Sequence, residues 1–470
     1  MPELPFPPPD AVTREAAVEL RRAWDDMLAR IGEAREAIDD PSLWPPPATE
    51  RNLAEGYRYV LGFLYGSIAR SIGPTAEYPY FVRMIQPLNR STIDNSDAIY
   101  LYAPIDGNHS YTIRGRTGDT RHWHGEPPVT SGRKAPHYVF LQTASGHSGD
   151  TGELDEMAPG SRANCAVMDS SDLQVNADGT FEILLGPEKP EGYTGNFMST
   201  RMVKKRRNAA GEEVSREYVA QMVGLREIFC DWEHEDLMDL FIYRNDRLGE
   251  PMPAYTPAQA ARQLRDAGRF TRNQVHFWNK FYGVTLEAYG DVNGDGKAFM
   301  PRNALNEPNA ASLATGGGMS TNIYCGGIFA LEADEALIVE VRQPVEPNYI
   351  GFCLGNLWGE SLDFANFQSS LNGVQAHRDA DNAIRYVIAH RDPGIHNWVD
   401  TTDHDEGYMC VRWAYSNKPK ENLPSATVRK VRWAELMGYL PATTRMISPE
   451  ERRRQIAIRQ EHVQRRYRHH

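Results

Sequence analysis

Residues 356–370, NLWGESLDFANFQSS, gather polar side chains of many kinds in one short segment. The segment follows 349–354, which is typical of a β-strand, so we expect it at a strand end or on the next loop, where sandwiches carry function. Glu360 and Asp363 lie three residues apart beside Trp358. An apolar ring could raise the pKa of one carboxyl while the other stays ionised, as in a paired acid and base. The alternative is a structural loop in which both carboxylates accept hydrogen bonds from backbone amides.

A second polar cluster lies in AHRDPGIHNW, residues 389–398. His390 ends an apolar segment that we expect to be a strand, and Asn397 and Trp398 begin the next strand after the DPG turn. A histidine can carry a proton, an amide can hold a hydroxyl or carbonyl, and an indole can stack on a ring. Because Asp-Pro-Gly is a common turn, the alternative is that Asn397 only holds this turn in place.

The sequence RHWHGE, residues 121–126, contains a possible metal-binding pair. On a strand, His122, His124 and Glu126 would point to one face, and cupin-type jelly rolls hold a metal with such a His-x-His pair. The segment GEPP turns the chain away almost at once, however, where a cupin needs a further glutamate on the strand. We therefore expect surface histidines and no metal, and a cupin-like metalloenzyme is the lowest of our alternatives.

The periodicity of apolar residues indicates which elements position these side chains. A helical period predicts amphipathic helices over 11–38 and from about 53 to 72, and SPEE at 448–451 opens a charged helix with a capping box. Short alternating runs between turn residues predict antiparallel strands over most of the remainder. We divide the chain into an N-terminal helical segment (1–79), a first β-sandwich (80–250), a helical insert and linker (251–319), a second β-sandwich (320–440) and a C-terminal helical arm (441–470).

The two β segments share one order of features, which indicates an internal duplication. In each, an aspartate opens a strand, a second Asp-initiated strand follows, and an Asn-aromatic pair and an arginine on a closing strand come later. The matched positions are Asp97 and Asp334, Asn196-Phe197 and Asn397-Trp398, and Arg226 and Arg412. One such unit would form a β-sandwich or jelly roll. We therefore predict a mainly β fold of two jelly-roll-like antiparallel sandwiches with added helices.

Composition limits the class of protein. The chain has 470 residues, a formal net charge of -12 and five cysteines, none of them in CxxC spacing. The acidic charge argues against nucleic acid as the main partner, and the scattered cysteines favour reduced thiols in the cytoplasm. We expect no membrane span and no secretory signal. Because nucleotide-binding glycine motifs and the GxSxG motif are absent, we also expect no cofactor and no serine-hydrolase elbow.

A resemblance to a known family covers about two-thirds of the chain. The runs YCGGIFALEADEALIVEVRQP, at 324–344, and GFCLGNLWGESLDFANFQSS, at 351–370, resemble the bacterial domain of unknown function 1214, densely over about 320–416. The stretch from about 80 to 245, with NSDAIYLYAPIDGNHSYTIRG and LREIFCDW, is similar to the companion domain numbered 1254. The resemblance implies a pair of jelly-roll-like sandwiches in one subunit, commonly in a homo-oligomer. It supplies no settled activity.

These observations lead to a hypothesis about function. We expect the two polar segments to face each other at one end of the second sandwich and to line a pocket for a neutral, hydroxylated, partly apolar molecule, such as a sugar or a terpenoid- or steroid-like compound. Glu360, Asp363 and His390 would move protons in a metal-free hydrolysis or elimination. The substrate-binding residues would be Trp358, Asn366, Asn397, Trp398 and Arg412. The alternative is a non-catalytic small-molecule-binding or assembly protein.

The C-terminal helix, expected over 448–468, has few apolar residues among many arginines. A helix of this length needs tertiary support to persist in water, and the acidic chain offers partners for its arginines. We therefore predict a homo-oligomer, a dimer or a dimer of dimers, in which the C-terminal arm crosses to another subunit. The N-terminal helix pair would offer a second contact.

Overall fold

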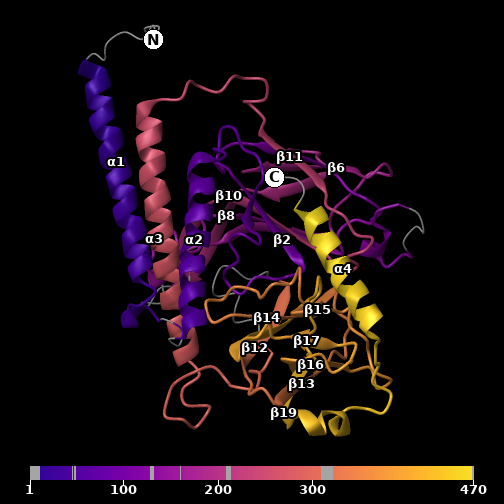
Figure 1. The fold of residues 1–470 in the computed structure, drawn as a ribbon. Helices are drawn as coiled ribbons and strands as arrows, with labels where there is room; N and C mark the ends of the chain where they lie inside the picture. The colour runs from indigo at the N-terminus through magenta and orange to yellow at the C-terminus, as the bar shows by residue number, and fades with distance from the viewer. Residues whose placement is uncertain are drawn as a thin grey trace, which may run out of the picture.

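Two β-sandwiches follow each other along the chain, with a layer of long helices on one side (Figure 1). The structure is a computed structural model that describes residues 11–44, 46, 49–127, 132–158, 160–207, 213–308 and 321–467. The predicted fold class, a mainly β chain of two sandwiches with a helical N-terminus and a C-terminal helix, is confirmed.

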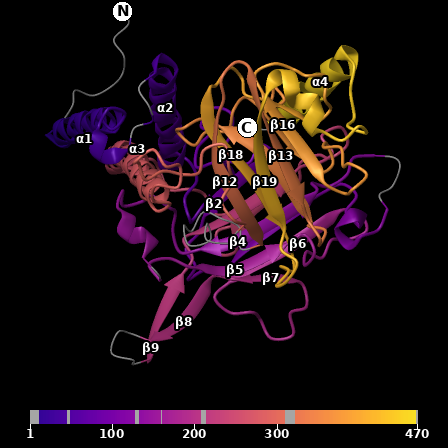
Figure 2. The same cartoon turned by 90° about the horizontal axis from the view of Figure 1, so that it is seen from below.

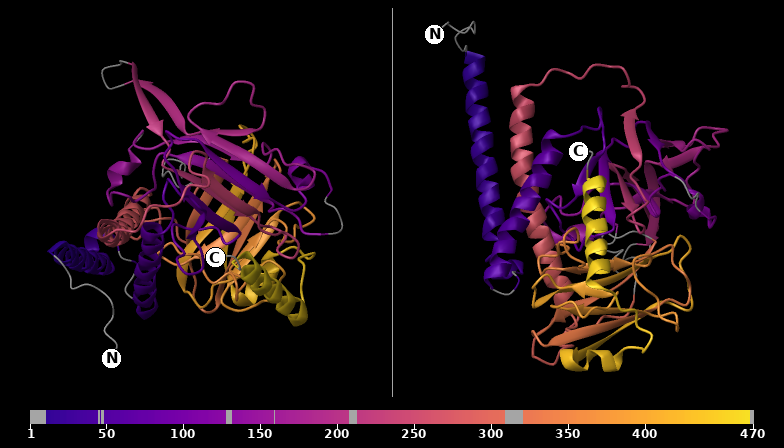
Figure 3. Two further views of the ribbon diagram at one scale, coloured as in Figure 1. Left: turned by 90° about the horizontal axis from the view of Figure 1, so that it is seen from above. Right: turned by 45° about the vertical axis from the view of Figure 1, so that its right-hand side comes forward.

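The helical layer consists of α1 (Ala11–Glu36), α2 (Glu50–Ile72) and α3 (Pro257–Glu287), which stand side by side (Figure 3). The Thr256 side chain accepts a hydrogen bond from the Gln259 amide, and Pro257 occupies the first turn of α3, so this helix begins with a complete capping box. Helix α1 approaches α3 closely at Gly268, where a Cβ atom would lie 2.8 Å from the Cα of Met27. Short 3-10 helices are η1 (Pro41–Leu43), η2 (Arg121–His124), η3 (Leu154–Met157) and η5 (Trp433–Tyr439).

The first sandwich consists of two sheets, with strand orders β1-β2-β10-β4-β5 and β11-β3-β6-β7. Their apolar faces enclose one core, in which Ile113 and Ile183 from one sheet meet Val139 and Val223 from the other. Strands β8 (Arg201–Arg207) and β9 (Glu213–Val219) form a hairpin that projects from the body (Figure 2). The sandwich strands are β1 (Val82–Ile85), β2 (Ala98–Pro104), β3 (Tyr111–Arg116), β4 (Tyr138–Ala144), β5 (Asn164–Asp169), β6 (Thr180–Gly186), β7 (Asn196–Ser199), β10 (Met222–Ile228) and β11 (Asp239–Arg244).

The second sandwich has sheets of order β12-β18-β14-β15 and β17-β16-β13-β19. Its core brings Phe352 and Trp413 of one sheet against Leu337 and Tyr386 of the other. The strands are β12 (Asn322–Ala330), β13 (Glu335–Arg342), β14 (Tyr349–Gly355), β15 (Ser370–Asn372), β16 (Ile384–Ala389), β17 (Trp398–Asp400), β18 (Glu406–Ala414) and β19 (Ser425–Arg432).

The strand orders repeat, which confirms the duplication. Sheet β2-β10-β4-β5 corresponds to β12-β18-β14-β15, and β11-β3-β6-β7 corresponds to β19-β13-β16-β17, including a parallel pair in each copy. Arg226 lies opposite Tyr100 as Arg412 lies opposite Tyr324. One detail of the sequence comparison was wrong. It matched the strand after Asp97 with the strand after Asp334, but β2 corresponds to β12, because an opening aspartate precedes more than one strand of the unit.

The two sandwiches meet through these corresponding sheets. Tyr138 and Ile228 of the first copy and Tyr349 and Ala414 of the second hold equivalent positions in the ladders and pack in one apolar cluster. The junction therefore joins like faces of two copies of one unit.

Helix α4 (Pro449–Arg466) closes one side of this junction. Arg452 pairs with Asp392 at 2.9 Å, Arg459 donates to the main-chain oxygens of Phe364 and Ser370, and Arg466 donates to the Ser96 oxygen at 2.6 Å. We call α4 with these contacts the clasp. The expectation that this arm crosses to another subunit was wrong, because its arginines bind carbonyls and a carboxylate of their own chain.

None of the helices in the described ranges is long and apolar enough to cross a membrane.

Candidate functional site

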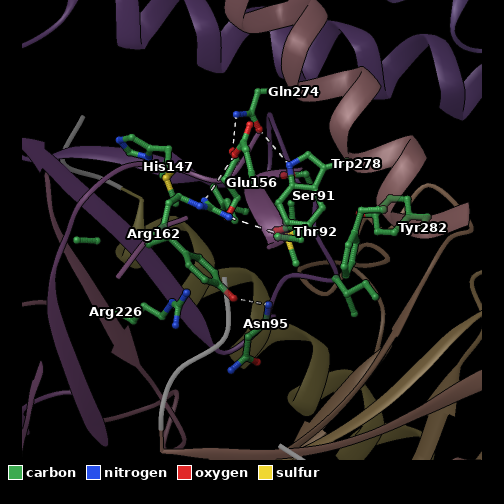
Figure 4. Close-up of a pocket in the computed structure, with 18 of the residues that line it drawn as sticks. Ser91, Thr92, Asn95, His147, Glu156, Arg162, Arg226, Gln274, Trp278 and Tyr282 are labelled. Carbon is green, nitrogen blue, oxygen red and sulfur yellow. Dashed lines mark hydrogen bonds and ion pairs between the residues drawn. The ribbon is translucent and has the colours of Figure 1, made fainter. Parts of the chain in front are cut away.

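A cavity of about 1040 Å³ lies where the two sandwiches meet the helical layer. Residues of α2 and α3 form its helical side, and β1, β2, β10, β12 and β18 contribute from the sandwiches. Figure 4 shows Arg226, Arg162 and His147 on one side of this space and Trp278 and Tyr282 on the other. The cavity is therefore built from segments that are far apart in the sequence.

Much of the lining is apolar and comes from the helices. Helix α3 contributes a series of aromatic side chains because Phe270, Trp278 and Phe281 lie on its inner side. The Trp278 Nε1–H donates to Gln274 at 3.0 Å, so the indole is held by a polar contact within its own helix. Phe63 of α2 and Met84 of β1 extend the apolar surface.

The charged side chains of the lining are mostly cationic. Arg70, Arg83, Arg162, Lys204, Arg226 and Arg412 all line the cavity, whereas Glu156 is the single carboxylate among the described lining residues. Arg70 pairs with Asp150 at 2.6 Å, and Arg162 lies 3.8 Å from Glu156. Cationic side chains therefore predominate among the charged residues of the lining.

Tyr100 lies close to two of these cations. Its ring centroid is 5.3 Å from the Arg226 guanidinium, and its oxygen accepts a hydrogen bond from the Asn95 amide at 2.7 Å. Burial raises the pKa of Tyr100 to about 12, and Arg412 and Arg226 act in the opposite direction. The phenol therefore keeps its proton at neutral pH and can donate a hydrogen bond.

His147 is the imidazole of the cavity lining. Its ring stands edge-on to Tyr102, with centroids 5.0 Å apart. Burial and the nearby Arg70 and Arg162 lower its pKa to about 3, although Asp150 opposes them. The imidazole is therefore neutral at pH 7 and can accept a proton or a hydrogen bond.

The polar loop predicted as the catalytic site packs into the protein instead. The Trp358 Nε1–H donates to the Asn52 oxygen at 2.8 Å, and its ring lies 5.2 Å from that of Tyr59 on α2. Glu360 is 2% exposed and accepts from the Asn356 amide at 2.8 Å. Burial raises its pKa, as expected for one carboxyl of an acid and base pair. Its surroundings, however, are α2, Arg90 and its own loop, and it does not line the cavity.

Asp363 and Asn366 have the structural role that we gave as the alternative. Asp363 accepts hydrogen bonds from the amides of Ala365 and Asn366, each at 3.0 Å, and from the Asn366 side chain at 2.8 Å. The carboxylate therefore holds a turn, and this turn is not part of the cavity.

The residues of the second cluster likewise satisfy main-chain groups. His390 contacts the Leu331 oxygen and the Thr401 hydroxyl at 3.1 and 2.9 Å. Asn397 accepts from the His377 amide and donates to two carbonyls, and the Trp398 Nε1–H donates to the Ala389 oxygen. Gln368 connects the two loops through the Trp398 oxygen at 2.6 Å, so the loops meet, but away from the large cavity. Of the predicted set, only Arg412 lines the large cavity.

The lowest alternative, a metal site at His122, His124 and Glu126, assumed a strand that does not form. His122 and His124 lie on the 3-10 helix η2, His124 and Glu126 are exposed, and His122 contacts the Pro136 oxygen at 3.2 Å. Across the described residues, no group of three or more His, Cys, Asp or Glu side chains could hold a metal ion.

The sequence analysis missed Tyr100, His147, Trp278 and Arg226 as residues of the cavity. One signal was present, because the repeat comparison found an arginine on the closing strand of each copy, Arg226 and Arg412. Only Arg412 was predicted as a site residue, because both polar segments that indicated a site lie in the second sandwich.

Comparison with known families supports the resemblance seen in the sequence. Residues 151–206 match the family model described as Protein of unknown function (DUF1214). The match lies in the first sandwich, whereas the sequence placed the dense resemblance at about 320–416. Because strands β4 to β7 correspond to β14 to β17, the two placements fall on corresponding parts of the duplicated unit. No curated protein matches the chain.

Solved structures support the fold alone. A crystal structure of an uncharacterized protein from Burkholderia cenocepacia superposes with a TM-score of 0.69 at 24% identity, over 89% of this chain and 99% of that one. A protein from Vibrio parahaemolyticus aligns over 85% of this chain and 100% of its own, with 10% identity and a TM-score of 0.39. The first is similar in overall architecture, and the second is too distant to support an argument.

Proposed function

We propose that the protein binds a small, largely apolar molecule in the cavity between its sandwiches, without converting it. The observation that carries the proposal is the size and lining of this cavity, about 1040 Å³ with aromatic side chains from α3. Ligand sites are typically concave, mostly apolar and fitted with a few polar groups. A protein interior is otherwise close-packed, so a space of this size at a junction is a feature that a ligand would explain.

An enzyme is the second candidate, favoured by the neutral His147 in the lining. The hydrolysis or elimination expected from the sequence would need an acid and a base within reach of the ligand. Glu360, Asp363 and His390 do not reach the cavity, so His147 and Glu156 would take these roles. Turnover of a bound molecule that is lost in His147→Gln, while its affinity is kept, would favour this candidate over simple binding.

A substitution that fills the cavity tests the binding proposal. Thr285 lies on α3 and lines the cavity, whereas the exposed Glu287 of the same helix does not. We expect the full chain to bind the neutral apolar dye Nile red saturably, with one site per chain. Thr285→Trp should reduce the affinity by about tenfold or more, because the indole occupies ligand volume, and Glu287→Trp should leave it unchanged. Nonsaturable binding, or equal binding by a folded Thr285→Trp, would refute the proposal.

We also propose that the chain forms a homo-oligomer through α2. This helix exposes an apolar row at helical spacing, with Leu61 64% and Ile72 63% exposed. Its other exposed apolar members are Leu53, Tyr57, Tyr65 and Ile68. A second copy could cover this row, since contiguous apolar patches on soluble proteins commonly mark interfaces. Light scattering should show a lower mass for Leu61→Glu than for the wild type, and equal masses would refute the proposal.

A cytoplasmic location is supported by five buried, unpaired thiols.

A further inference from the structure

Two arginines at corresponding positions of the two sandwiches line one cavity. Arg226 lies on β10 opposite Tyr100, and Arg412 lies on β18 opposite Tyr324. The duplication has therefore placed one guanidinium from each copy at the same space. Guanidinium groups bind carboxylates with paired, charge-assisted hydrogen bonds.

Arg412 is buried without a counter-charge in direct contact. It is 5% exposed, and none of its acceptors among the described residues is a carboxylate oxygen. Its Nη2 donates to the Ile93 oxygen at 3.1 Å and more weakly to the Asp94 main-chain oxygen and to the Cys353 and Cys410 sulfurs, while its Nε has no partner in the described part of the chain. Keeping a cation away from water is costly unless an opposite charge or hydrogen bonds compensate. These acceptors are neutral, and an anion in the cavity would add the opposite charge.

Tyr100 adds a neutral donor beside the two cations. Its oxygen already accepts from the Asn95 amide, and across the described residues its O–H donates to no group. The ring lies against the Arg226 guanidinium, and the Tyr100 side chain is 9% exposed. The phenol proton is therefore available to a ligand atom in the cavity.

We propose that the ligand is an organic acid whose carboxylate is bound by Arg226, Arg412 and Tyr100. Its apolar body would extend along Trp278 and Phe281 of α3, which line the same cavity. This inference rests on the proposed binding function and narrows its ligand class from apolar molecules to apolar acids. A neutral, hydroxylated ligand, as expected from the sequence, would bring no opposite charge to this cationic lining.

Binding of octanoate and 1-octanol, which have equal chain lengths, tests the inference in the full-length protein. Calorimetric titration should show octanoate binding about tenfold or more tightly than 1-octanol, because only the carboxylate forms charge-assisted contacts with the arginines. Arg226→Met should weaken octanoate binding about tenfold and leave 1-octanol affinity nearly unchanged. Tyr100→Phe, which removes only the hydroxyl, should weaken octanoate binding about threefold.

Arg114→Met is the matched control, since Arg114 is an exposed arginine of β3 that pairs with Glu182 outside the cavity. It should change neither affinity. If 1-octanol binds as tightly as octanoate, and Arg226→Met and Tyr100→Phe change nothing, the acid assignment is overturned while the cavity remains a binding site. If neither compound binds the wild type and Nile red also fails to bind, the proposed function fails with it.

Discussion

On one side of the junction between the sandwiches, α4 inserts Arg459 and Arg466. On the other side, β10 and β18 present Arg226 and Arg412 to a cavity. Arg466 donates to the Ser96 oxygen at 2.6 Å and lies 4.6 Å from the Trp232 ring, so protein groups enclose it. Arg412 donates to the Ile93 oxygen and lines the cavity. Among the described residues, the Nε of Arg412 and the Nε and Nη2 of Arg466 have no partner. A buried arginine with an unpartnered nitrogen is thus no sign of a ligand by itself. The two arginines differ because Arg412 borders a space that a ligand could enter, whereas Arg466 does not.

The largest expected effect is on stability and comes from a substitution that breaks the clasp. Arg466→Ala removes the contact to Ser96 and leaves a void among Phe229, Trp232 and Phe364. We expect the free energy of unfolding to fall by about 3–5 kcal/mol, measured by chemical denaturation. Arg226→Met should cost less than about 1 kcal/mol in the same assay, because that side chain is partly exposed. Equal losses would show that both sides of the junction serve stability alone.

A second, smaller effect separates the polar loop from the cavity. Trp358 packs against α2 at Gly56 and Tyr59. Trp358→Ala should destabilise the protein by about 3 kcal/mol, while the folded variant keeps the Nile red and octanoate affinities of the wild type. Fluorescence-monitored unfolding and titration would measure both. If Trp358→Ala is stable but no longer binds Nile red or octanoate, the functional site lies at the loop of residues 356–370.

The smallest effect concerns pH, since each side of the junction holds a histidine whose pKa is lowered. Burial and nearby arginines lower the pKa of His147 to about 3 and that of His462 well below its usual range. Both imidazoles stay neutral in the folded protein, whereas in the unfolded chain they take up protons below about pH 6.5. Stability is therefore present above pH 6.5 and falls as the pH drops toward 3.

We expect His147 to account for roughly 1–2 kcal/mol of the loss between pH 7 and pH 4, discounted because its ring borders the cavity. Denaturation curves of His147→Gln should show a shallower loss than the wild type over this range, as should those of His462→Gln. The exposed His124→Gln is the control and should follow the wild type. A His147→Gln curve parallel to the wild type would contradict the assigned pKa.

The elements could be predicted from the sequence because each leaves a local pattern. Helices α1 and α2 show apolar periodicity, α4 opens with a capping box, and the strands alternate between turn residues. The cavity leaves no such pattern, because Phe63, Tyr100, Trp278 and Arg412 come from segments far apart in the sequence. Polar richness at 356–370 and 389–398 was misleading for a physical reason. Loops packed against a protein must satisfy buried amides and carbonyls, and Asp363 and Asn397 do this.

Helix α4 follows both sandwiches in the chain, and this order has a consequence for synthesis. Each sandwich has its own core and can form as it emerges from the ribosome, since domains generally fold as units during translation. The clasp can close only after Arg466 has emerged, because its contacts reach back to Ser96 and Trp232. A chain interrupted before residue 449 would therefore present two folded sandwiches with their shared aromatic surface uncovered. Such a product would be recognised by chaperones and proteases. Docking of α4 is therefore the last folding step, and only a chain that contains this helix can complete it.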